Sequence, residues 1–120
     1  MINPSSKRTV SVKTIDEYNY NDVDLIKIDV EGAEYSVIEG AINTIKCCKP
    51  LLIVEIEQRH ISQPIENVFE LITNLEYVGY FLLEGELLSL HEFDYAVHQE
   101  PYLGDEMNKS YVNNFIFMPS

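Results

Sequence analysis

The sequence predicts an α/β domain with a mainly parallel sheet and flanking helices. The chain has 120 residues, 46% of them hydrophobic, which suffices for one domain with a modest core. Apolar, β-branched runs alternate with segments whose apolar residues recur at helical spacing. This alternation is typical of strands joined by crossover helices. We expect residues 1–8 to be a flexible lead and residues 9–120 to form the domain.

The first elements are two strands and a helix. A strand is expected at 9–15, where small polar and β-branched residues alternate. A second is expected at 24–30, whose mostly β-branched apolar residues suit a strand buried on both faces. Gly32 ends this strand. A helix follows over 33–47, because its apolar residues fall on one face.

The second half of the chain predicts further strands around one helix and one long loop. These elements are a strand at 51–57, a helix that starts at 62–64, a hairpin of strands 77–83 and 86–90, and a last strand at 111–118. Residues 91–110 have no clear period and predict a long loop. Its aromatic residues could form a lid or a platform for a sugar, or they could fill the core beneath the loop.

Composition excludes several classes of function. The formal net charge is -12 with only eight Lys and Arg, which argues against binding nucleic acid or an anionic membrane surface. No apolar run approaches the roughly 18 residues that span a bilayer. The two cysteines, Cys47 and Cys48, are adjacent and rarely form an unstrained disulfide. A reducing, cytoplasmic location is therefore expected.

An acidic turn follows the strand at 24–30. In open α/β sheets, ligands bind outside the carboxyl ends of the strands, and Asp29, Glu31 and Gly32 lie at such an end. A charge at the end of an apolar strand is costly to bury unless it is paired or useful, and Gly32 lets the backbone turn and approach a ligand closely. The turn, together with Glu34, is either a ligand site or simply a capped strand–helix junction.

A second group of polar residues follows the strand at 51–57. Glu55 and Glu57 are two apart, so only one of them can face the same side as Asp29. If Asp29 and one of these two glutamates meet, they could bind a divalent cation such as magnesium, or shift each other's pKa. His60 could act as a general base, or it could be an ordinary solvated side chain.

Several motifs, in order, resemble those of the FkbM family of S-adenosylmethionine-dependent methyltransferases. The most specific is the run at 23–34, VDLIKIDVEGAE, followed by Gly40-Ala41. Weaker matches flank it. They are Thr14-Ile15-Asp16, Lys49-Pro50 with the strand that ends in Glu55, Gly79-Tyr80, and the terminal 114–119 segment NFIFMP. The resemblance spans roughly residues 9–119.

The resemblance implies a Rossmann-like, class I methyltransferase fold and methyl transfer to a hydroxyl of a sugar or another small molecule. It implies S-adenosylmethionine as the cofactor, near Asp16, Asp29 and Gly32. The family's acidic turn and next strand-end carboxylate map to Asp29, Glu31 and Glu55. With His60, these are the candidate catalytic residues, and Asp29 and Glu55 are the candidate metal ligands.

One departure from the family pattern leaves two functions open. The family's amino-terminal strands, which carry most cofactor contacts, are expected to be missing, so the chain would be the carboxyl-terminal portion of such a domain. The strand at 24–30 would then be an apolar edge able to pair with another chain. The chain is therefore either part of an O-methyltransferase or a non-catalytic remnant that binds a partner through this edge.

Overall fold

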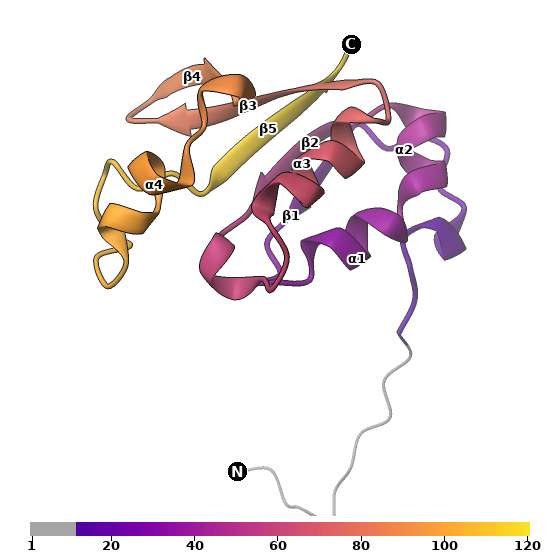
Figure 1. The fold of residues 1–120 in the computed structure, drawn as a ribbon. Coiled ribbons are helices and arrows are strands. Elements are labelled where there is room, and N and C mark those ends of the chain that lie inside the picture. Colours follow the sequence, from indigo (N-terminus) through magenta and orange to yellow (C-terminus); the bar gives the residue numbers. More distant parts are fainter. Residues whose placement is uncertain (1–11) are drawn as a thin grey trace, which may run out of the picture.

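The computed structural model describes residues 12–120 and shows an α/β fold (Figure 1). The predicted lead at 1–8 and the start of the predicted strand at 9–15 lie outside the described residues. The strands are β1 (Leu25–Ile28), β2 (Leu51–Glu55), β3 (Tyr77–Leu83), β4 (Glu86–Ser89) and β5 (Asn114–Pro119). The α-helices are α1 (Glu34–Glu39), α2 (Ile42–Cys48), α3 (Ile65–Thr73) and α4 (Tyr95–His98).

The five strands form one mixed sheet in the order β1-β2-β5-β3-β4. The expectation of a mainly parallel sheet was wrong, because only β1 and β2 pair in parallel. β5 lies between β2 and β3 and is antiparallel to both, and β3 and β4 form an antiparallel hairpin. The crossover through α1 and α2 makes the parallel pair. β3 runs in the same direction as β2, but the returning β5 separates them.

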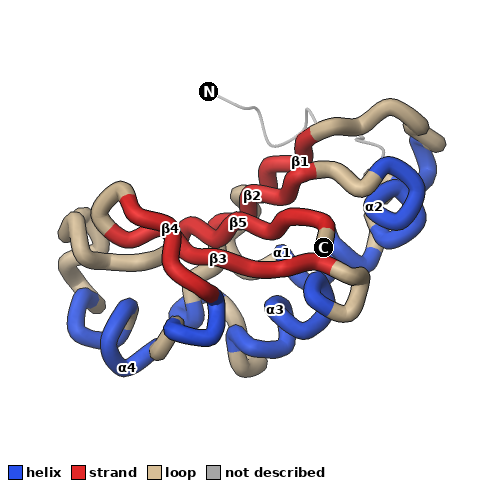
Figure 2. Tube along the Cα trace, turned by 90° about the horizontal axis from the view of Figure 1, so that it is seen from above, coloured by secondary structure: helices blue, strands red, loops and turns tan. Residues whose placement is uncertain are grey.

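The core lies on one face of the sheet. Burial alternates along β1 and β2, and helices α1 and α3, which pack together, lie on the side of the buried residues (Figure 2). The core residues contributed by the strands include Ile26, Ile28, Leu52, Val54, Phe81, Phe115 and Phe117. The prediction that strand 24–30 is buried on both faces was therefore wrong. β1 is an edge strand of the described sheet, and Leu25 on its other face is 51% exposed.

The predicted helix over 33–47 is two helices, α1 and α2, which are separated at Gly40 and Ala41. The break is in contact with Thr14 and with Asp16, the first residue of η1 (Asp16–Tyr18). The Asp16 amide donates to the Gly40 carbonyl at 2.8 Å. A Cβ on Gly40 would lie 2.9 Å from the Thr14 Cβ, so Thr14 packs directly against the break. No strand forms over residues 12–15, so the expectation of a strand there was wrong in the described part.

The carboxyl-terminal half contains the predicted hairpin and last strand, but the expected loop at 91–110 is partly helical. It contains three short turns of helix, η3 (Leu90–Glu92), α4 and η4 (Glu100–Tyr102). Phe93 packs edge-on against Phe69, Phe81 and Phe115, with ring centroids 5.2–5.8 Å apart. This aromatic residue thus fills the core. Among the helices of residues 12–120, none combines the length and the hydrophobicity that a membrane-spanning helix needs.

Candidate functional site

The acidic turn lies directly after β1, at its carboxyl end. Asp29 and Glu31 are exposed, so the buried carboxylate of the turn is Glu34, which is only 1% exposed. Glu34 Oε2 accepts a hydrogen bond from the Gly32 amide at 2.7 Å. Glu31 and Gly32 have φ values of 38° and 104°. A Cβ on Gly32 would lie 2.6 Å from the His60 carbonyl oxygen, so glycine is required for the turn to meet the loop after β2.

The Glu55 carboxyl, at the end of β2, meets the Asp29 carboxyl from the neighbouring strand. Partial burial raises the pKa of Glu55, and Asp29 raises it further through a hydrogen bond and its charge. The charges of Glu57 and Glu31 act in the same direction. β1 and β2 are parallel and in register, with Ile28 opposite Val54, which explains why the residues that follow them come together. Of the two glutamates that could meet Asp29, it is therefore Glu55 that does so.

The two predicted metal ligands, Asp29 and Glu55, lie together, but within residues 12–120 no third ligand joins them. Within residues 12–120, no group of three or more His, Cys, Asp or Glu side chains is arranged to hold a metal ion. Two carboxylates close together, one with a raised pKa, form a site that can hold and release a proton. Proton transfer is the chemistry that these residues support without a metal.

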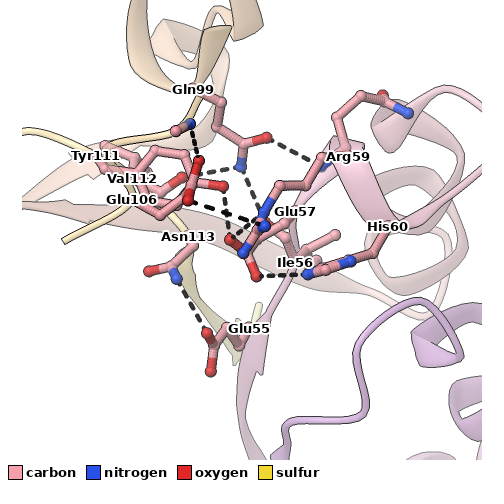
Figure 3. A network of polar contacts seen from close by, with 12 residues as sticks. Glu55, Ile56, Glu57, Arg59, His60, Gln99, Glu106, Tyr111, Val112 and Asn113 are labelled. Carbon is pink, nitrogen blue, oxygen red and sulfur yellow. Dashed lines mark hydrogen bonds and ion pairs between the residues drawn. The ribbon is translucent and has the colours of Figure 1, made fainter. Parts of the chain in front are cut away.

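Glu57 points away from Glu55 into a buried polar network (Figure 3). It is 6% exposed, and its Oε1 accepts hydrogen bonds from the Tyr111 hydroxyl at 2.6 Å and from Arg59 Nε at 3.2 Å. Burial raises the pKa of Tyr111, and the Glu57 carboxylate raises it further. His60 Nε2 lies 3.3 Å from Glu57 Oε2. His60 therefore faces Glu57, on the other side of the strand end from the carboxyl pair.

Asp16, a predicted cofactor contact, caps helix α2. Its Oδ1 accepts hydrogen bonds from the Thr44 amide at 2.8 Å and from the Thr44 hydroxyl at 2.7 Å, and its Oδ2 accepts one from the Asn43 amide at 3.0 Å. Partial burial acts to raise the pKa of Asp16, but these hydrogen bonds outweigh it and leave the pKa below 3.8. The structure thus gives Asp16 a role in holding α2, apart from the acidic turn.

Three residues of the site escaped the sequence analysis, namely Gln99, Tyr111 and Asn113. Gln99 is 1% exposed and links the end of β2 to the segment before β5. Asn113 Nδ2 donates to Glu55 Oε1 at 3.0 Å. These residues lie in or beside a stretch without periodicity, so the sequence carries no local signal for their contacts. Only the two adjacent polar residues Asn113 and Asn114, just before the apolar run of the last strand, hint at such contacts.

Comparison with family models identifies the family of the chain. Residues 2–82, more than half of the chain, match the model of the methyltransferase FkbM domain. The matched residues include β1, the acidic turn and the β2 end with Glu55. Comparisons with curated proteins and with solved structures found no match. The chain therefore belongs to the FkbM methyltransferase family.

Proposed function

We propose that the chain provides the proton-accepting side of an S-adenosylmethionine-dependent O-methyltransferase. The observation that carries this proposal is the Asp29–Glu55 carboxyl pair at the ends of two parallel strands, within a domain of a methyltransferase family. The acceptor is proposed to be a hydroxyl of a sugar or of another small molecule. The free cysteines Cys47 and Cys48 support a cytoplasmic location.

The carboxylates of the acidic turn suit the positively charged end of the proposed cofactor. S-adenosylmethionine carries a positively charged sulfonium, and Asp29 and Glu31 are exposed carboxylates two residues apart in the turn. Attraction between these charges would favour the methyl-bearing end of the cofactor there. Asp16 fits less well as an adenine contact, because both of its carboxylate oxygens already accept hydrogen bonds from α2.

Methyl transfer to a hydroxyl needs a group that takes the hydroxyl proton. When bound, S-adenosylmethionine supplies the methyl group, with a carbon–oxygen bond replacing the carbon–sulfur bond, whose electron pair stays on sulfur. We assign the proton to the Asp29–Glu55 pair. We assign the accepting role within the pair to Glu55, because its pKa is raised from the ordinary carboxyl value toward the range in which a base works best. Glu31 adds negative charge beside the pair.

Calorimetric titration of the purified chain with S-adenosylmethionine tests this function. We expect heat with a micromolar midpoint, lost in Asp29→Ala and retained in Glu39→Ala. Glu39 is a matched control because it is an exposed carboxylate at the far end of α1. Equal heats from parent and Asp29→Ala would contradict the assignment of the turn.

A second function is favoured by the place of β1 at the sheet edge. In this alternative the chain is non-catalytic and binds another chain, whose strand pairs with β1. Leu25 on this strand is 51% exposed, which would give such a partner an apolar contact. A chain that binds no S-adenosylmethionine in the titration, but self-associates in sedimentation equilibrium, would favour this alternative over the enzyme.

A further inference from the structure

The segment that precedes β5 is fixed to the end of β2 by one buried side chain, Gln99. Its Nε2 donates to the carbonyls of Ile56 and Val112, both at 2.9 Å, and its Oε1 accepts from the Gln58 amide at 3.0 Å (Figure 3). Both amide hydrogens of Gln99 are thus used, and all three partners are main-chain groups. Two further main-chain bonds, from Ile56 to Asn113 and from Val112 to His98, tie the same segments together.

This attachment sets where Asn113 lies. Because the Ile56 amide donates to the Asn113 carbonyl at 2.9 Å, the Asn113 backbone is held beside the residue that follows Glu55. The Asn113 side chain then reaches Glu55 Oε1, with Nδ2 at 3.0 Å. Its own Oδ1 accepts from Asn114 Nδ2 at 3.3 Å, so the amide orientation that presents Nδ2 to Glu55 is supported from the other side.

Asn113 gives Glu55 an uncharged hydrogen-bond donor. The acidic side chains around Glu55, in contrast, disfavour its charged form. The other groups that act on this carboxyl are Asp29, Glu31 and Glu57, all of them acidic. A hydrogen bond to a carboxylate favours its charged form. It also occupies one oxygen in a fixed direction, which leaves the second oxygen for Asp29 or for a proton.

We propose that Asn113 is a positioning residue that fixes the orientation of the Glu55 carboxyl toward Asp29. This inference rests on the proposed function, in which the Asp29–Glu55 pair takes the proton of the acceptor hydroxyl. Asn113 donates its hydrogen bond to Glu55 and acts on the acceptor through it. Gln99 and the main-chain bonds around it hold Asn113 in place.

The test follows ionisation of Glu55 by carbon-13 NMR of its carboxyl group in the parent, Asn113→Ala and Asn113→Ser. Loss of the amide donor in Asn113→Ala is expected to raise the pKa of Glu55 above the parent's, because the charged form loses a hydrogen bond. Asn74→Ala is the matched control, since Asn74 is exposed at the end of α3, and its titration curve should superimpose on the parent's.

An unchanged or lowered Glu55 pKa in a folded Asn113→Ala would overturn the proposal, even if the variant were less stable. Asn113→Ser keeps a small polar side chain and replaces Asn113→Ala if that variant does not fold. Unfolding of both would also overturn it, because Asn113 would then be a structural residue. These readings need no methyl transfer. A raised Glu55 pKa in a chain that binds no S-adenosylmethionine would keep the positioning contact and contradict the proposed function alone.

Discussion

Gln99→Leu should destabilise the fold strongly, because it leaves three main-chain groups without their partner. The Ile56 and Val112 carbonyls each accept one hydrogen bond from Gln99, and the Gln58 amide donates one to it; Gln99 is 1% exposed. A buried polar group left unsatisfied costs about 1–3 kcal/mol. Even the lower end gives a loss of about 3 kcal/mol for the three groups, a large part of the roughly 5–15 kcal/mol that stabilises a typical domain.

Urea unfolding followed by circular dichroism measures this loss. We expect the midpoint to fall with little change in slope, since leucine fills a similar volume and the folded state should stay compact. Gln63→Leu is the matched control, because Gln63 is exposed and, among residues 12–120, its side chain hydrogen-bonds only to Asn67. Its effect should stay within about 0.5 kcal/mol. A Gln99→Leu variant that is as stable as Gln63→Leu would refute the role given to Gln99.

Two further predictions have opposite pH dependence. Asp16→Ala should cost about 1–2 kcal/mol of stability at neutral pH, as loss of a helix cap does. Since the pKa of Asp16 is lowered from 3.8, this contribution is present above that value and disappears as the pH falls through the lowered pKa. The difference in free energy of unfolding between Asp16→Ala and the parent should therefore close in acid. Asp22→Ala, which removes an exposed carboxylate, should be as stable as the parent at neutral pH. Glu55→Gln should be more stable than the parent at neutral pH. The pKa of Glu55 is raised from 4.5, so its favourable contribution is complete below 4.5 and is lost as the pH rises through the raised pKa. The gain in stability of Glu55→Gln over the parent should therefore shrink at low pH. A gain that does not change with pH, or no gain, would contradict the raised pKa of Glu55 beside Asp29.

Local patterns predicted those elements whose partners are near in sequence. The turn at Glu84-Gly85 joins β3 and β4 as expected, because both residues adopt positive φ values of 48° and 84°. The helical crossover between β1 and β2 was expected as well, and it makes these two strands a parallel pair. In both cases the sequence itself contains the determining signal.

Errors arose where distant segments decide the structure. The break between α1 and α2 depends on Thr14 and Asp16, which pack against Gly40 and cap α2 from outside the helix. The mixed sheet depends on β5 returning between β2 and β3 from the far end of the chain. The contact of Asn113 with Glu55 depends on that same return. The spacing of apolar residues along one helix or strand cannot predict such contacts, because they join residues that are far apart in the sequence.

The most direct test of the central claim is a titration of nitrogen-15-labelled chain with S-adenosylmethionine, followed by amide chemical shifts. The account predicts that the largest shifts fall on residues 29–32 and 55–57, and that Asp29→Ala abolishes them. Amides of α2 and of the residues around Asn74 should remain unmoved, because they lie away from the carboxyl pair. Saturable shifts confined to those distant residues, or no shifts at millimolar cofactor, would contradict the claim that the acidic turn and Glu55 form a methyl-transfer site.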